Sequence, residues 1–180
     1  MYFVTLDLEM NQPSGKILQV GACVGNFDTG EILAKYSEHI KLDEPLNPFI
    51  IQLTGITKQQ VDNVSPLVKA YEVLRTLYNE HNCFRNPITW GGGDSEFLRQ
   101  QLDYQDDWIF GRRWIDLKTI FQFYRFSTNQ QVQGGLAKSL TKVGLKFEGR
   151  KHDALDDAVN TFRLAYKMKA LFWKIFIRKN

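Results

Sequence analysis

Two carboxylates one residue apart near the N-terminus are the strongest chemical signal in the sequence. Asp7 and Glu9 lie at the end of an apolar run that begins at Tyr2. Side chains at positions i and i+2 of a β-strand point to the same face, so these carboxylates project together. Two carboxylates roughly 4 Å apart repel by about 4 kcal/mol at an effective dielectric constant of about 20. A divalent cation would turn this repulsion into attraction, and the pair therefore predicts half of a metal site.

A third acidic residue, Asp94, follows three glycines in the middle of the chain. A predicted strand over residues 86–90 runs into Gly91-Gly92-Gly93, and a predicted helix follows. Strand ends that open into a Gly-rich turn are where α/β sheets place their ligands. Asp94 is therefore a candidate metal ligand. In the alternative interpretation it only caps the helix, because Asp is a preferred N-cap residue.

His152 and Asp157 form a second candidate pair near the C-terminus. Their spacing of five would place them about 140° apart within one helix at 3.6 residues per turn. They converge only if His152 lies in a loop before the helix, which predicts Asp153 as the N-cap and a helix from about Ala154 to Trp173. Acidic side chains in a first helical turn also complement the helix dipole, and this is the alternative interpretation of Asp156 and Asp157.

The elements that would position these residues follow from hydrophobic periodicity and turn signals. Apolar patterning and turn residues predict strands over 2–8, 17–27, 32–42, 86–90 and 114–117, with a turn at Asp28-Thr29-Gly30 and a break at Leu46-Asn47-Pro48. Helical spacing and capping signals predict helices after Thr57 and Ser65, around Phe97 to Leu102, over about 120–126, and over about 135–143. Early strands followed by helices that alternate with single strands favour an α/β domain with a mixed sheet.

Composition is that of an ordinary globular protein. The 180 residues are 43% hydrophobic and 24% charged, which predicts a single domain over residues 1–180. No signal peptide is recognisable, and the apolar stretch 171–177 is too short to span a bilayer. We expect the two cysteines, Cys23 and Cys83, to be reduced thiols, and we expect a cytoplasmic protein without a membrane partner.

Together these segments resemble a known enzyme family. Asp7-x-Glu9, then Asp94 after Trp90-Gly-Gly-Gly, then His152-x4-Asp157 resemble the three motifs of the DEDDh (DnaQ-like) 3′-to-5′ exonucleases. The Leu-Thr-Gly-Ile-Thr segment that begins at Leu53 is also typical of that family. The chain is most similar to the Eri-type exoribonuclease branch, although Asp-Leu-Glu-Met is also similar to oligoribonucleases. The resemblance implies an RNase H-like fold with a mixed central five-stranded sheet flanked by helices.

The resemblance also implies a chemistry. Such enzymes hydrolyse phosphodiester bonds from the 3′ end of RNA or single-stranded DNA and release 5′-mononucleotides. Two divalent ions, Mg²⁺ or Mn²⁺, would be held by Asp7, Glu9, Asp94 and Asp157, with Asp7 bridging both and Asp94 acting mainly through water. His152 would be the general base. The implied partner is a nucleic acid with a free 3′ end, and the chain would act as a monomer or homodimer.

Substrate-binding residues follow less directly. Candidates are the residues beside the predicted ligands and motifs, together with basic residues of the region before His152: Leu8, Met10, Leu53, Thr54, Phe97, Lys146 and Arg150. Ordinary core packing is the alternative for the apolar residues, and a solvated surface is the alternative for the basic ones. No acidic residue occurs from Arg163 onward, a bias that fits contact with phosphates.

Three other functions remain open from the sequence. The first is an oligoribonuclease-like enzyme that degrades very short oligonucleotides. The second is a non-catalytic nucleic-acid-binding module on the same fold, although all five chemical positions are present in the sequence. The third is a different metal-dependent phosphohydrolase, against which the spacing of His152 and Asp157 argues.

Overall fold

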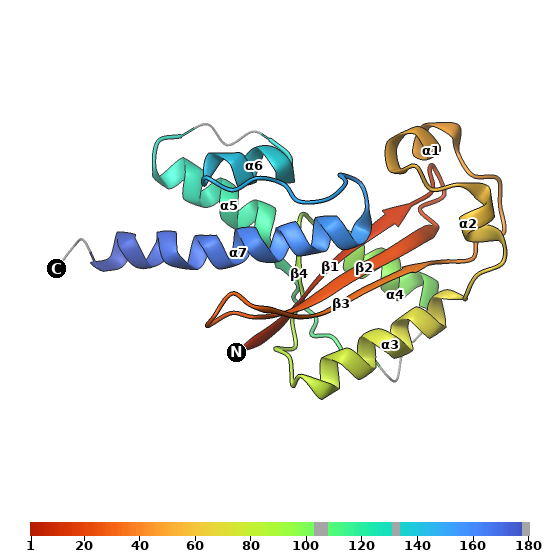
Figure 1. Ribbon diagram of the computed structural model, residues 1–180, viewed down its shortest axis with the longest axis horizontal. Helices are drawn as coiled ribbons and strands as arrows, with labels where there is room; N and C mark the ends of the chain where they lie inside the picture. Colours follow the sequence, from red (N-terminus) through yellow and green to blue (C-terminus); the bar gives the residue numbers. More distant parts are fainter. Residues whose placement is uncertain (103–107, 131–133, 178–180) are drawn as a thin grey trace.

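The computed structural model describes residues 1–102, 108–130 and 134–177 and shows a layered α/β fold (Figure 1). Its strands are Tyr2–Met10 (β1), Ile17–Asn26 (β2), Ile32–His39 (β3), Ile88–Thr89 (β4) and Ile115–Asp116 (β5). Its helices are Pro48–Thr54 (α1), Lys58–Asp62 (α2), Leu67–Glu80 (α3), Asp94–Leu102 (α4), Leu117–Ser127 (α5), Leu136–Lys142 (α6) and Ala154–Ile177 (α7). This order agrees with the predicted alternation of early strands and later helices.

The five strands form one mixed sheet in the order β3-β2-β1-β4-β5. The first three strands are an antiparallel meander, in which Asp7 of β1 lies opposite Gly21 of β2. β4 joins β1 in parallel, with Thr5 opposite Ile88, and β5 continues the parallel half. The predicted mixed five-stranded sheet is confirmed, and β1 occupies its centre.

Alternation along β1 separates two hydrophobic cores. Val4, Leu6 and Leu8 point to the core that α3 and α4 cover. Phe3 belongs to the opposite core, which α5, α6 and α7 cover (Figure 1). The hydroxyl of Thr5 donates to the carbonyl oxygen of Ala158 in α7, at 2.9 Å. Asp7 and Glu9 share the face of Phe3 and Thr5, so their side chains point toward the α7 layer.

A glycine determines how closely α7 approaches the sheet. A Cβ atom built on Gly21 would lie 2.0 Å from the backbone carbon of Ala154 and 2.1 Å from the nitrogen of Leu155. Real Cβ atoms do not approach backbone atoms so closely, so the first turn of α7 lies against bare β2 backbone. Because Gly21 is opposite Asp7, this contact brings the start of α7 to the level of the β1 carboxylates.

Several details differ from the sequence predictions. Helix α1 was not predicted, although Asn47 caps it by accepting from the Phe49 N–H and Pro48 occupies its first turn. The third strand ends at His39 rather than at residue 42, because Leu42 bonds to Val61 and leaves the sheet. β1 extends to Met10, so Glu9 is a strand residue.

Two predictions about the whole chain can be compared with the described residues. Cys23 and Cys83 are free, in agreement with the predicted reduced thiols, and both are buried. Among the helices that the structure describes, none combines the length and apolarity needed to cross a bilayer.

The Gly21 contact predicts a large effect of a small substitution. Gly21→Ala should lower the free energy of unfolding by at least about 2 kcal/mol, because the new methyl group overpacks against the α7 backbone. Gly92→Ala is the matched control, since a Cβ there would meet nothing within 4 Å. Urea denaturation of both variants measures the difference, and equal stabilities would contradict the described contact.

Candidate active site

A cleft of about 420 Å³ opens where β1 meets the start of α7. It is lined by Asp7, Glu9, His152 and Asp157, so the acidic pair on β1 and the predicted pair near the C-terminus meet in one cavity. Trp90, Leu136 and Phe147 contribute apolar wall, and Lys138 and Lys151 contribute positive charge. A cavity of this size with a few convergent polar groups is typical of a ligand site.

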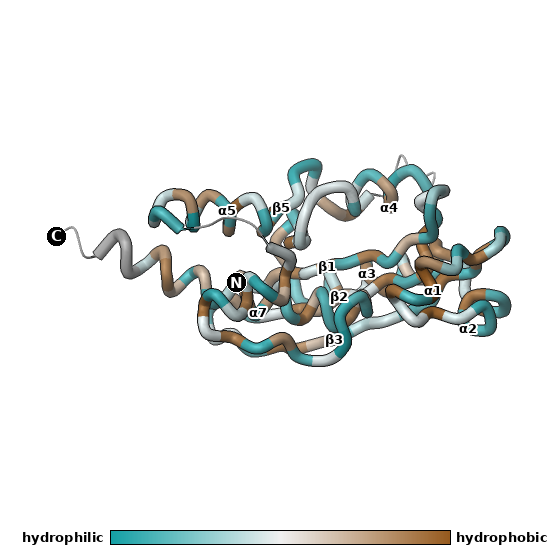
Figure 2. Tube along the Cα trace, turned by 90° about the horizontal axis from the view of Figure 1, so that it is seen from above, coloured by the Kyte–Doolittle hydropathy of each residue, from teal (hydrophilic) through white to brown (hydrophobic). Residues whose placement is uncertain are grey.

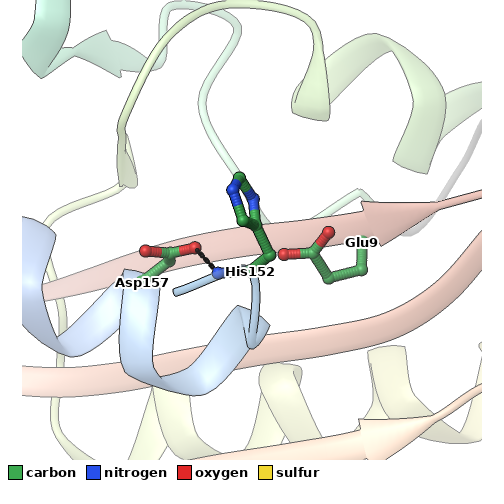
Figure 3. Close-up of side chains that lie close together, drawn as sticks. All are labelled: Glu9, His152 and Asp157. Atoms are coloured by element: carbon green, nitrogen blue, oxygen red, sulfur yellow. Dashed lines mark hydrogen bonds between the residues drawn. The ribbon is translucent and has the colours of Figure 1, made fainter. Parts of the chain in front are cut away.

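Three side chains in this cleft form a compact group. Ligand atoms of Glu9, His152 and Asp157 lie within 4.8 Å of one another. Figure 3 shows the His152 side chain between the two carboxylates, with Glu9 on the strand and Asp157 on the helix. Glu9 is buried, whereas His152 is exposed to solvent. The group therefore combines a buried acidic side with an imidazole that can exchange protons with water.

The main chain before α7 is tied to side chains of that helix. His152 has a left-handed backbone conformation, with φ at 60°, and its N–H donates to Oδ2 of Asp157 at 3.0 Å. The N–H of Arg150 donates to Asp156, and the amide of Asn160 bonds both the N–H and the carbonyl oxygen of Glu148. A non-glycine residue at positive φ carries strain that its surroundings must hold, and such residues cluster at functional sites.

Asp153 and Gln19 fix the start of α7. Oδ1 of Asp153 accepts from the N–H groups of Leu155 and Asp156, which confirms the predicted N-cap. Its Oδ2 accepts from the amide of Gln19 at 3.1 Å, and the Gln19 oxygen accepts from the N–H of Ala154 at 3.2 Å. Gln19 was missed by the sequence analysis, although a glutamine within the apolar run of β2 is a recognisable signal.

Burial and mutual repulsion raise the pKa of both β1 carboxyls. Burial is the larger cause for Glu9 and raises its pKa to about 8, with the charge of Asp157 next and that of Arg150 acting in the opposite direction. The pKa of Asp7 is raised well above its usual value, first by burial and then by the charges of Asp94 and Asp157. Asp94 is thus electrostatically coupled to Asp7, although it does not line the cleft itself.

The other two acids show the same tendency. Burial, and then the charge of Asp116, raises the pKa of Asp94 to about 7. Burial raises the pKa of Asp157 to about 6, although the N–H of His152 works against this shift by donating to the carboxylate. Asp94 occupies the first position of α4 rather than the residue before the helix.

This donor set fits a divalent cation. Burial raises the pKa of all four carboxyl groups, and the charges of Asp94 and Asp157 raise the pKa of both Asp7 and Glu9 further. Oxygen donors of this type are preferred by hard divalent cations such as Mg²⁺ and Mn²⁺. A bound cation would supply the positive charge that these carboxylates lack, and it would favour their ionised forms.

The predicted substrate-binding residues are more dispersed than the acids. Leu8 lines the cleft, but its side chain belongs to the core on the opposite face of β1. Met10 packs beside that core, and Leu53 is half-buried. The hydroxyl of Thr54 donates within α1 to the carbonyl oxygen of Ile50, at 2.8 Å. Phe97 lies against Gly15.

The two basic candidates occupy different surroundings. Lys146 is exposed, and its carbonyl oxygen accepts from Arg163. The guanidinium group of Arg150 lies directly over Gly55, where a Cβ would be 2.0 Å from Nη2. Arg150 therefore spans from the segment before His152 to the end of α1, and its charge reaches Glu9. Trp90, Phe147, Lys138 and Lys151 also line the cleft, and no sequence signal pointed to Phe147 as one of these residues.

Because the pKa values of these acids are raised, the free energy of unfolding of the metal-free protein should fall, rather than rise, as the pH increases above the ordinary carboxyl pKa. Between its ordinary pKa of 4.5 and about 8, Glu9 is protonated in the folded state and ionised in the unfolded state. The folded state then binds more protons, so its stability should fall as pH rises, by up to about 1.4 kcal/mol per pH unit for each such group. Urea denaturation in EDTA at pH 5 and pH 7.5 measures this fall, and adding Mg²⁺ should reduce it. Equal stabilities in EDTA would contradict the crowding of these acids.

Comparison with known proteins agrees with this geometry. The exonuclease family model RNase_T matches residues 4–165. ERI1 exoribonuclease 2 from Mus musculus is 27% identical over 93% of this chain, which spans 28% of that protein. The 3′-5′ exoribonuclease 1 from Homo sapiens is 27% identical over 93% of this chain, which spans 52% of that protein. The chain therefore covers only part of the length of these relatives.

Solved structures share the fold. The nuclease domain of 3′hExo, described as a DEDDh family member bound to rAMP, superimposes with a TM-score of 0.78 at 24% identity and covers 94% of this chain and 92% of that domain. Cell-death related nuclease 4 (CRN-4) superimposes with a TM-score of 0.79 at 17% identity, over 94% of this chain and 64% of that one. The family match over most of the sequence shows that the chain belongs to the DEDDh RNase_T exonuclease family.

Proposed function

We propose that this protein is a metal-dependent 3′-to-5′ exonuclease that hydrolyses RNA or single-stranded DNA and releases 5′-mononucleotides. The observation that carries the proposal is the meeting of Glu9, His152 and Asp157 in a cleft that Asp7 also lines. Family membership supports the reaction class. The names of the relatives, which are exoribonucleases, favour RNA as the substrate.

The four carboxylates would hold two divalent ions, Mg²⁺ or Mn²⁺. Asp7 would contribute to holding them, because the charges of Asp94, Asp157 and Glu9 all act on its carboxyl group and raise its pKa. Glu9 and Asp157 would hold one ion, and Asp94 would help to hold the other. When bound, such ions activate a water molecule and stabilise the charge that develops on the phosphate and leaving oxygens.

His152 would act as the general base for the attacking water. Its exposed ring can take a proton at an imidazole nitrogen and pass it to solvent. The bond from its N–H to Asp157 holds the residue beside the carboxylates without occupying a ring nitrogen. The ring therefore stays available for proton transfer while the main chain is fixed.

The walls of the cleft fit a terminal nucleotide. Trp90 and Phe147 offer apolar surface to a base or sugar, and Trp90 also packs on Phe121, with ring centroids 6.2 Å apart. Lys138 and Lys151 place positive charge where a phosphodiester backbone would enter. In this arrangement the 3′-terminal nucleotide lies beside Glu9, and the nucleotide that precedes it in the strand lies beside α6.

Removing the proposed base tests the catalytic assignment. His152→Ala should lower kcat on single-stranded RNA by about 10²–10⁴-fold, because general-base catalysis contributes that much. Mn²⁺ affinity, measured by titration calorimetry, should change little, since the carboxylates remain. His81→Ala is the matched control, because His81 is a half-buried histidine at the end of α3 that does not line the cleft. Full activity of the His152 variant would remove this residue from the mechanism.

A substrate panel tests the direction and the class of substrate. The protein is incubated with 5′-labelled RNA, single-stranded DNA, a duplex with a 3′ overhang and a dinucleotide, each with Mg²⁺ or with EDTA. We expect a ladder that shortens from the 3′ end with Mg²⁺ and intact substrates with EDTA. Hydrolysis of the dinucleotide alone would favour an oligoribonuclease-like function. Cleavage in EDTA would contradict metal dependence.

A further inference from the structure

Helix α5 carries exposed aromatic side chains outside the cleft. Ile120, Phe123 and Phe126 recur every three residues, and 69% of Phe123 and 72% of Phe126 is exposed. Figure 2 shows hydrophobic and hydrophilic residues interleaved along this helix. Large apolar side chains grouped on the surface are typical of interaction sites. Leu117 and Phe121 pack α5 into the core, whereas the rings of Phe123 and Phe126 lie outside that core.

The layer that contains α5 is strongly biased toward positive charge. Residues 117–147 include five Lys or Arg and no Asp or Glu, whereas the whole chain has 23 basic and 20 acidic residues. Helix α7 also contains no Asp or Glu beyond its first turn. Two of its basic residues pair with acids from elsewhere in the chain: Arg163 with Glu148, and Lys169 with Asp28. α5, α6 and α7 lie together on one face of the sheet (Figure 1). Aromatic and basic side chains without acids suit a polyanion that carries planar bases.

α5 starts at the catalytic edge and runs away from it. Asp116, which caps α5, pairs with Thr89 at the end of β4, next to Trp90 in the cleft wall. The aliphatic part of the Lys118 side chain passes beside Gly91, since a Cβ built on Gly91 would lie 3.9 Å from Cδ of Lys118. From this end the helix extends outward from the sheet (Figure 1). The exposed residues are therefore continuous with the proposed active site.

We propose that α5 is a second nucleic-acid contact, in which Lys118, Phe123 and Phe126 bind the single-stranded nucleotides upstream of the 3′ end. This inference rests on the proposed function and extends it to longer substrates. The rise from Lys118 to Phe126 is about 12 Å, and stacked nucleotides at about 3.4 Å each would place roughly three along it. Lys118 meets phosphates, and the two phenyl rings stack on bases.

Charge favours this occupant over a second copy of the chain. A symmetric dimer through α5 would bring the same acid-free surface of both copies together, which is electrostatically unfavourable. A nucleic acid instead neutralises the surface and releases its own counterions.

Binding without turnover tests the inference independently of catalysis. The affinity of the intact protein for a fluorescein-labelled 15-nucleotide oligouridylate is measured by anisotropy in EDTA. Phe123→Ser/Phe126→Ser should weaken it by at least about tenfold, because stacking contributes strongly for each base. Val68→Ser/Val73→Ser, which changes exposed apolar residues of α3 on the opposite face, should leave it unchanged. Lys118→Ala should lower the slope of log affinity against log salt by about 1.

The outcomes separate the two proposals. With Mg²⁺, the ratio of the rates on the 15-mer and on a dinucleotide should fall in the Phe123/Phe126 variant. A wild-type protein that binds the 15-mer but cleaves neither substrate contradicts the exonuclease function and leaves the α5 contact supported. Equal affinity of wild type and the Phe123/Phe126 variant overturns the α5 contact, as does absence of binding by the wild type. A change from dimer to monomer in sedimentation, with affinity unchanged, identifies the surface as a self-association site and also overturns it.

Discussion

The docking of α7 on β2 is the contact on which the site depends. Gly21 removes the side chain that would keep the helix away, and Gln19 bonds both Asp153 and the N–H of Ala154. With the helix at this distance, Asp157 lies beside Glu9 instead of facing solvent alone. The packing of the fold thereby holds together charges that would separate if each were free.

The four acids of the site are crowded together without an equal number of positive charges among the residues described nearby. Carboxylates brought together in partial burial destabilise a folded protein unless protons or cations share the region. Here the four acids have raised pKa values, each with burial as the largest cause. Hydrophobic packing on both faces of β1 supplies the stability that offsets this repulsion. The fit of this site to a cation therefore arises from the packed fold rather than from any single residue.

Much of this could be predicted from local patterns in the sequence. The i, i+2 spacing placed Asp7 and Glu9 on one face of a strand, and the spacing of His152 and Asp157 required a loop before a capped helix; the structure has both. Helix α1 was missed because its signals, Asn47 and Pro48, also end a strand. The part of the cleft wall at Phe147 could not be predicted, since Phe147 is distant in sequence from Trp90 and their meeting depends on the whole fold. Gly21 acts through a helix-to-sheet contact that no local pattern encodes, whereas Gln19 is visible in the sequence only as a polar residue within an apolar strand.

The anchoring of the segment before α7 has a mechanical consequence. Glu148, Arg150 and His152 are bonded at every second residue to Asn160, Asp156 and Asp157 of the same helix. The imidazole and its neighbouring carboxylate consequently belong to one rigid unit. If the cleft opens during the proposed reaction, the movement should therefore separate this unit from β1, and Glu9 would shift relative to both His152 and Asp157.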